Sequence, residues 1–183
     1  MTMKLMFASD IHGSASSMEA VLRQYRTEGA SRLVLLGDLL YHGPRNDLPR
    51  DYAPKEVIGI LNGMKQRLLC VRGNCEAEVD QMVLEFPVMA DYMALFLDGR
   101  MAFVTHGHLF NMDNPPPLCP GDLLIHGHTH VQAFTHFGED NWYINPGSMA
   151  IPKEGNAHSY MTYEDGLFTI KTVEGELIRK LCL

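Results

Sequence analysis

The chain lacks the features of secreted, membrane-spanning and disulfide-bonded proteins. Its 183 residues include four cysteines, and no two of them form a C-x-x-C pair. The apolar runs at residues 33–36 and 94–97 are too short to cross a bilayer, and residues 1–8 lack the long apolar segment and small-residue cleavage site of a secretory signal. We therefore expect a cytoplasmic protein with reduced cysteines and no membrane contact.

Positive charge is also scarce. Lys and Arg number 15 against 22 Asp and Glu, a formal net charge of -7. A chain with this balance is not suited as a whole to binding the backbone of nucleic acids, so we expect no stable nucleic-acid partner. The hydrophobic content of 46% and the charged content of 20% are typical of a folded globular protein. The length fits a single domain, residues 1–183.

The N-terminal half alternates short apolar runs with helical periodicity. Residues 4–8 and 33–36 predict buried strands with a helix between them, for which Ser16 and Glu19 offer a capping box. A second helix is predicted to begin near Pro54 and to precede a strand at residues 67–71. This alternation of strands and helices favours a parallel sheet.

The second half changes to a hairpin pattern. Residues 92–97 and 101–105 flank the two-residue turn Asp98-Gly99, and later short strands are separated by residues 138–141 and 164–166. An α/β beginning that continues into hairpins indicates an α/β (α+β) fold, in which two sheets pack together with helices outside.

Each apolar strand is followed by a compact group of Asp, Asn or His beside glycine. The groups are Asp10-Ile11-His12-Gly13, Gly37-Asp38, Gly73-Asn74, His106-Gly107-His108 and His126-Gly127-His128-Thr129-His130. Because the carboxyl ends of parallel strands face one crevice, we expect these groups to converge. Asp10 and His12 stand two apart at the end of a predicted extended segment, so their side chains can point the same way and bind one ion.

Taken alone, each group has an ordinary explanation. An aspartate such as Asp10 or Asp38 often caps a helix or closes a turn. The combination is different, because five of the nine histidines lie between His106 and His130. Carboxylate, carboxamide and imidazole donors together are typical of a metal site, and they suit Mn, Fe or Zn better than Cu(I) or an iron-sulfur cluster.

The donors are too many for one tetrahedral ion. Seven candidates fill two sites if one carboxylate bridges them, namely Asp10, His12, Asp38, Asn74, His106, His128 and His130. Two divalent ions about 3.5–4 Å apart can clamp the oxygens of a phosphate group. The predicted chemistry is therefore phosphoester hydrolysis.

In this order the five groups resemble the motifs of the calcineurin-like metallophosphoesterase superfamily. The resemblance rests on D-I-H-G at Asp10, G-D at Gly37, G-N at Gly73, T-H-G-H at Thr105 and G-H-T-H at Gly127. H-G-P-R-N at His42, G-N-C-E-A-E-V-D at Gly73 and N-P-G-S at Asn145 are similar to the small prokaryotic phosphodiesterases of the YfcE type. Five motifs in the right order are specific, although any one alone is not.

The resemblance implies a four-layer αββα sandwich of two mixed β-sheets flanked by helices. It implies that one ion is bound by Asp10, His12, Asp38 and His130, and a second by Asp38, Asn74, His106 and His128. Mn is the metal most expected, with Zn or Fe as alternatives. The implied activity is that of a phosphodiesterase, in which a hydroxide bridging the two ions attacks phosphorus in line. A phosphomonoesterase, a nucleotide pyrophosphatase and a non-catalytic interaction scaffold on the same fold stay open as alternatives.

The catalytic candidates are Asp38, Asn74, Cys75, His108 and Arg45. Cys75 stands where many members of the superfamily have a histidine that is thought to protonate the leaving group. A thiol is a poor substitute, since it carries no positive charge when protonated, so we expect a preference for good leaving groups or a thiol that is merely packed.

Arg45 could bind a phosphate oxygen or lie in an exposed loop, and His108 could face the substrate or have a structural role. The expected partner is a small phosphodiester. Residues 92–97 could contribute an interface, which leaves a homo-oligomer open.

Overall fold

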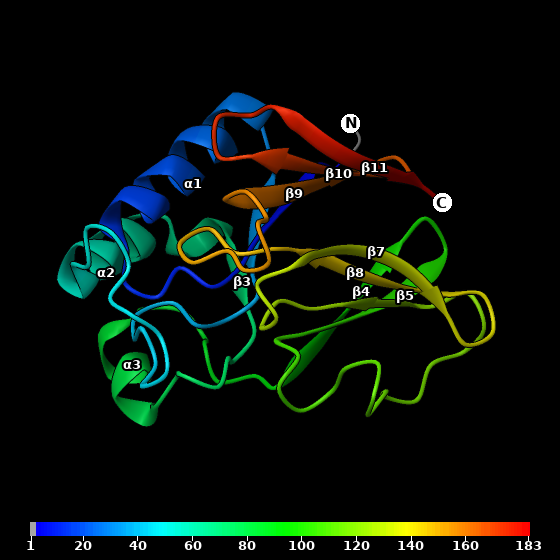
Figure 1. Cartoon of the computed structure of the whole chain (residues 1–183), viewed down its shortest axis with the longest axis horizontal. Coiled ribbons are helices and arrows are strands. Elements are labelled where there is room, and N and C mark those ends of the chain that lie inside the picture. The colour runs from blue at the N-terminus through cyan, green and yellow to red at the C-terminus, as the bar shows by residue number, and fades with distance from the viewer. Residues whose placement is uncertain (1–2) are drawn as a thin grey trace.

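The computed structural model describes residues 3–183, which form two mixed β-sheets packed face to face, as predicted (Figure 1). The six-stranded sheet has the order β11-β10-β9-β1-β2-β3, and these strands are Leu177–Cys182, Leu167–Thr172, Ser159–Glu164, Leu5–Ala8, Arg32–Leu35 and Leu68–Cys70. The five-stranded sheet has the order β4-β5-β6-β8-β7, and these strands are Tyr92–Leu97, Arg100–Thr105, Leu123–Ile125, Asn141–Pro146 and Gln132–Phe137.

Each sheet combines parallel and antiparallel pairs. Strands β1, β2 and β3 pair in parallel, and so do β5, β6 and β8. The remaining pairs are antiparallel, among them the hairpin of β4 and β5 around the predicted turn Asp98-Gly99. The polar groups identified in the sequence follow the carboxyl ends of β1, β2, β3, β5 and β6.

Three α-helices occur in residues 3–183: α1 (Ala15–Glu28), α2 (Pro54–Gly63) and the short α3 (Glu78–Val83). Helix α2 begins at Pro54, as predicted, because proline needs no hydrogen-bond acceptor in the first turn. The cap of α1 is Ser14, whose hydroxyl accepts the backbone N–H of Ser17 at 3.3 Å. The capping box predicted at Ser16 and Glu19 is therefore wrong.

Strand β1 is apolar on both faces because both faces are covered. Met6 and Ala8 pack in one cluster with residues of α1 and α2, such as Met18 and Leu61. The alternate residues of β1 pack in a second cluster with residues of the five-stranded sheet. Burial on both sides explains why this strand reads as a continuous apolar run.

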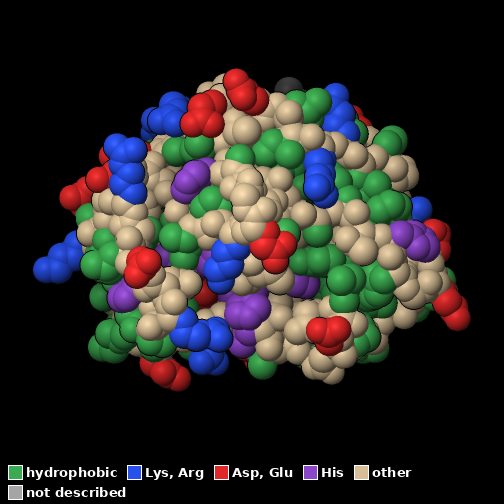
Figure 2. All heavy atoms as spheres, viewed as in Figure 1, with side chains coloured by type: hydrophobic (Ala, Val, Ile, Leu, Met, Phe, Trp, Pro, Cys, Tyr) green, Lys and Arg blue, Asp and Glu red, His purple; other side chains and the backbone are tan. Residues whose placement is uncertain are grey.

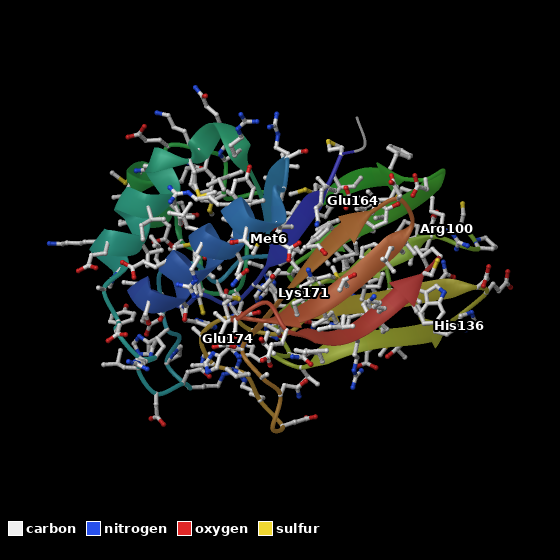
Figure 3. The ribbon with its side chains drawn as sticks, turned by 90° about the horizontal axis from the view of Figure 1, so that it is seen from above. Met6, Arg100, His136, Glu164, Lys171 and Glu174 are labelled. Atoms are coloured by element: carbon white, nitrogen blue, oxygen red, sulfur yellow. The ribbon has the colours of Figure 1, made fainter. Side chains whose placement is uncertain are left out.

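Helices α1 and α2 pack against the six-stranded sheet, and the short α3 lies below α2 in the view of Figure 1. Phe110, in the loop after β5, packs against the five-stranded sheet, where its ring centroid is 5.3 Å from that of Phe103 and 6.4 Å from that of Tyr92. Seen from above, the labelled residues Arg100 and His136 lie at the end of the molecule remote from the helices (Figure 3). No helix within residues 3–183 has both the length and the apolar character to span a membrane.

Candidate metal centre

The polar groups converge because the loops that carry them are hydrogen-bonded to one another beyond the ends of their strands. Beyond the end of β1, the backbone N–H of His12 donates to the carbonyl of Asp38 at 2.8 Å. From the five-stranded sheet, the N–H of His128 donates to Asp10 Oδ2 at 3.1 Å. These contacts join loops from both sheets at one place, as the sequence predicted.

The first group of donors surrounds the carboxylate of Asp10. Its Oδ1 lies 3.1 Å from Nε2 of His130 and 3.6 Å from Nε2 of His12. The three residues are 0%, 3% and 1% exposed, respectively. His12 Nε2 also lies 3.7 Å from Oδ2 of Asp38. The four residues assigned to one ion thus present their donor atoms to a common buried point.

The second group surrounds His106. Its Nε2 lies 3.5 Å from Asp38 Oδ2, 3.1 Å from Asn74 Oδ1 and 3.2 Å from His128 Nδ1. Asp38 therefore contacts both groups of donors. A carboxylate in this position can bridge two ions, and the structure brings all seven predicted ligands together.

Five of the seven candidate ligands have left-handed backbone conformations. These are Asp10 (φ 56°), His12 (φ 48°), Asp38 (φ 54°), His128 (φ 65°) and His130 (φ 61°). Such conformations are uncommon for residues with a side chain, and they cluster at functional sites, where the surrounding structure compensates for the strain. The extended geometry assumed for Asp10 and His12 is wrong, since their side chains meet through a turn of the backbone.

Backbone carbonyls orient three of the imidazoles. Nδ1 of His12 donates to the carbonyl of Tyr41 at 2.8 Å, and Nδ1 of His130 donates to that of Ile151 at 2.7 Å. Nδ1 of His106 contacts the carbonyl of Leu36 at 2.6 Å in the same way. Because a carbonyl only accepts, Nδ1 carries the proton, and the lone pair of Nε2 faces the cluster.

The residues present fit divalent cations. Asp10 Oδ1 and His12 Nε2 are buried without a hydrogen-bond partner, a costly arrangement that a cation would relieve. Burial and the nearby His106 lower the pKa of His128 to about 4, so its imidazole is neutral at pH 7 and available as a ligand. Burial acts to raise the pKa of Asp10, but the neighbouring imidazoles of His12 and His130 outweigh it and hold this pKa well below its usual value.

Two glycines allow the loops to approach so closely. A Cβ atom on Gly127 would lie 2.7 Å from Asp10 Oδ2 and would collide with Ser9 Oγ. A Cβ atom on Gly73 would lie 2.5 Å from the backbone nitrogen of Asp38. The glycine beside each polar group is thus required by contact with a loop from another strand.

Glu76 is a buried residue of the site that the sequence analysis did not identify. Its Oε2 accepts the backbone N–H groups of Asp38 at 2.8 Å and Gly73 at 2.5 Å, and its Oε1 accepts that of Leu39 at 2.7 Å. Burial and repulsion from Asp38 raise the pKa of Glu76 to about 7. The carboxylate ties together the loops that carry two ligands. In the sequence, Glu76 is marked only by its position two residues after Asn74, which does not show that it is buried.

A cleft of about 460 Å³ opens over the donor cluster, and Arg45 and Cys75 line it. Burial and the charge of Asp38 raise the pKa of the Cys75 thiol far above its ordinary value, so the thiol stays protonated. Lys153 also lines the cleft, and no motif in the sequence predicted it. Figure 2 shows histidine side chains at the centre of one face, bordered by Lys and Arg side chains.

His108 lies beside the cluster rather than among the residues that line the cleft. Its ring is 5.4 Å from that of His106 and 6.3 Å from that of His128. Burial and the proximity of His106 lower the pKa of His108, so the ring is neutral at pH 7. This position lets it pack against two of the candidate ligands.

Comparison with known proteins agrees with this geometry. Residues 3–165 match the family model described as "Calcineurin-like phosphoesterase superfamily domain". Phosphodiesterase YfcE of Escherichia coli K12 is 46% identical over 176 residues, which cover 96% of this chain and 95% of that protein. Phosphodiesterase MJ0936 of Methanocaldococcus jannaschii is 23% identical over 154 residues, which cover 79% of this chain and 83% of that protein.

Solved structures show the same fold. The structure of YfcE, described as a phosphoesterase from E. coli, has a TM-score of 0.94 at 45% identity and covers 98% of this chain and 99% of its own. A Vps29 from Entamoeba histolytica in complex with zinc has a TM-score of 0.58 at 17% identity, covering 98% and 99%, and shares the fold. With its family model, its relatives and its ordered donor cluster in agreement, the chain belongs to the calcineurin-like phosphoesterase superfamily.

Proposed function

We propose that the protein is a dinuclear, metal-dependent phosphodiesterase. The observation that carries the proposal is the position of Asp38, whose Oδ2 lies 3.7 Å from His12 Nε2 and 3.5 Å from His106 Nε2. A carboxylate shared between two groups of donors is what a pair of ions in one site requires. Two divalent ions held there would neutralise the charge of a phosphate group and supply a hydroxide nucleophile at neutral pH.

The ligands divide between the two ions by proximity. Asp10, His12, Asp38 and His130 would hold one ion, and Asp38, Asn74, His106 and His128 would hold the other. Oxygen and imidazole donors of this kind suit Mn best in our proposal, with Zn or Fe as alternatives. The Nδ1 protons of His12, His106 and His130, held by backbone carbonyls, keep Nε2 of these residues free for the ions.

The cleft residues set the conditions for bond cleavage. The Arg45 guanidinium can donate hydrogen bonds to a phosphate group in the cleft. Cys75 offers only a neutral thiol, which accepts a hydrogen bond from Asn74 Nδ2 at 3.3 Å and is a weak proton donor. The leaving group therefore departs with little acid assistance, which favours esters of acidic alcohols or phenols. His108 supports the rings of the neighbouring ligands.

The choice of a diester rests on two observations. The relative that is 46% identical over nearly the full chain is named a phosphodiesterase. The cleft of about 460 Å³ has the size of a small-molecule site and extends beyond the donor cluster, which leaves room for two ester groups.

The proposal is tested by removing bound metal with a chelator, adding Mn and comparing hydrolysis of bis(p-nitrophenyl) phosphate with that of p-nitrophenyl phosphate. The matched control is Asn74→Ala, which removes one ligand. We expect diester cleavage that depends on Mn and is lost in the variant. Faster monoester cleavage would make the protein a phosphatase, and no turnover despite two bound ions per chain would favour the interaction scaffold.

Several predictions from the sequence stay predictions. They are a single domain over residues 1–183, a cytoplasmic location and the absence of a stable nucleic-acid partner. The oligomeric state stays open, with residues 92–97 as the segment that could contribute an interface. Tyr92 and Phe96 of this strand are 54% and 80% exposed, which is consistent with an interface. Light scattering at two protein concentrations tests the oligomer.

A further inference from the structure

Two cationic side chains reach the cleft from loops far apart in the sequence. Arg45 lies in the loop between β2 and α2, and Lys153 lies in the loop between β8 and β9. Both line the cleft over the donor cluster, and neither is a candidate metal ligand. Among residues 3–183, Asp38 is the one acidic residue that lines this cleft, and it belongs to the metal centre.

Both loops are fixed to ligands of the same candidate ion. Within the loop of Arg45, the carbonyl of Tyr41 accepts Nδ1–H of His12 at 2.8 Å. In the other loop, the carbonyl of Ile151 accepts Nδ1–H of His130 at 2.7 Å, and Lys153 N–H donates to the carbonyl of His130 at 3.2 Å. The backbones of the two loops are thus tied to ligands of the same candidate ion.

Across residues 3–183, no carboxylate lies within 4.0 Å of the charged groups of Arg45 or Lys153. Most Lys and Arg side chains in this part of the chain are likewise unpaired, so what distinguishes these two is that both line the cleft. The chain as a whole carries a net charge of -7. Two unpaired cations at one cleft of an acidic protein indicate an anionic ligand.

A simple diester bound at the metal centre would not need the positive charges of Arg45 and Lys153. The four positive charges of two divalent ions would be opposed by the carboxylates of Asp10 and Asp38, by one hydroxide and by the single negative charge of a diester. This balance is already neutral before the partial negative charge of the buried Glu76 is counted. Arg45 and Lys153 add two further positive charges, which match the charge of about −2 on a terminal phosphate group at pH 7.

We propose that the preferred substrate is a phosphodiester that also carries a terminal phosphate, and that Arg45 and Lys153 bind this second phosphate. The inference rests on the proposed function, since it names the class of diester that the cleft accepts. An arginine fork can bind two phosphate oxygens, and a lysine adds a point charge. Binding of this second phosphate by the two residues then determines specificity.

The test uses a matched pair of substrates, the p-nitrophenyl ester of thymidine 5′-phosphate with and without a 3′-phosphate. Both have the same scissile bond and leaving group. We expect the Mn-loaded protein to favour the 3′-phosphorylated ester by about tenfold in kcat/KM, the effect of two solvent-exposed ion pairs. The ratio should fall in Arg45→Gln and in Lys153→Gln, and it should approach one in the double variant.

The control variants remove the same charge elsewhere. Arg50 lies in the same loop as Arg45, but its side chain is 91% exposed and does not line the cleft. Lys180 is exposed on β11. Arg50→Gln and Lys180→Gln should keep the wild-type ratio. A wild-type ratio near one overturns the proposal, as does an equal loss for both substrates in Lys153→Gln or a similar fall in the controls.

A binding measurement separates this inference from the proposed function. Calorimetry with the Mn-loaded protein compares thymidine 3′,5′-bisphosphate with thymidine 5′-phosphate. Tighter binding of the bisphosphate that is lost in Lys153→Gln supports the second phosphate site even if no diester is cleaved. Cleavage of bis(p-nitrophenyl) phosphate combined with equal affinity for the two nucleotides keeps the phosphodiesterase and overturns the site.

Discussion

Replacing Gly127 by alanine should disturb the metal centre through one methyl group. The new Cβ would lie 2.7 Å from Asp10 Oδ2 and 2.8 Å from Ser9 Cβ, well inside an ordinary contact of about 3.5–4 Å. Ser9 and Asp10 are fully buried, so neither side chain can turn aside into solvent. Asp10 Oδ2 also accepts hydrogen bonds from Ser9 Oγ at 2.5 Å and from His128 N–H at 3.1 Å, and a displaced carboxylate would weaken both.

The expected loss of stability combines two effects. Overpacking a closely packed site costs about 1–3 kcal/mol, and a weakened buried hydrogen bond costs about 1 kcal/mol more. A loss of about 2–4 kcal/mol would lower the melting temperature of a protein of this length by about 5–15 °C. Because Asp10 is a candidate ligand, Mn should also raise the melting temperature of Gly127→Ala less than that of the wild type.

The matched control is Gly59→Ala in α2, where no atom lies within 4 Å of the new Cβ. Alanine in a helix is favoured over glycine by about 0.5–1 kcal/mol, so this variant should melt slightly above the wild type. Thermal unfolding is followed by circular dichroism, with chelator and with Mn. The reasoning is refuted if Gly127→Ala melts within 1 °C of the wild type in chelator.

Three further predictions concern charge and the cleft. Burial would raise the pKa of Glu28, but hydrogen bonds from Lys171 and Lys4 hold it at about 2. The contribution of the Glu28 carboxylate to the free energy of unfolding is therefore complete above pH 4.5 and is lost as the pH falls towards 2. In urea unfolding, Glu28→Gln should be less stable than the wild type by about 1–3 kcal/mol at pH 6, and this difference should shrink at pH 2.5. Equal differences at the two pH values would contradict this. Cys75→His should raise the rate of cleavage of thymidylyl thymidine by at least about tenfold relative to that of bis(p-nitrophenyl) phosphate, because an imidazolium can protonate a poor leaving group. An unchanged ratio of the two rates would argue against a missing proton donor at position 75. Burial acts to lower the pKa of His12, but Asp10 outweighs it and raises this pKa. Because a proton on the imidazole competes with the metal, calorimetry should show weaker binding of Mn at pH 6 than at pH 8. Equal affinities at the two pH values would be inconsistent with His12 as a ligand.

The parts of the fold that follow local rules were predictable from the sequence. Proline fixes the backbone angle of a first helical turn, and α2 begins at Pro54. Asp98-Gly99 closes the hairpin of β4 and β5 because both residues adopt positive φ angles, 48° and 83°. The convergence of the polar groups was also predictable, since it depends only on their positions after parallel strands.

Features that depend on contacts between distant segments were not predictable. Ser14 caps α1 and also donates to the carbonyl of Arg50 at 2.8 Å, so a loop 36 residues away selects it over Ser16. The left-handed turns at the ligands occur at Asp and His, which adopt them more readily than most residues, but residue type alone does not say which Asp or His does so. Lys153 follows no motif, and its place at the cleft depends on the hydrogen bonds that tie its loop to His130.

The central claim is that this chain holds two metal ions bridged by Asp38. Titration of the metal-stripped protein with Mn, followed by electron paramagnetic resonance, tests it directly, because two bridged Mn ions give a spin-coupled spectrum that isolated ions do not. We predict two Mn per chain and a coupled spectrum for the wild type, with the coupling lost in Asp38→Ala. One Mn per chain, or two without coupling, would contradict the account.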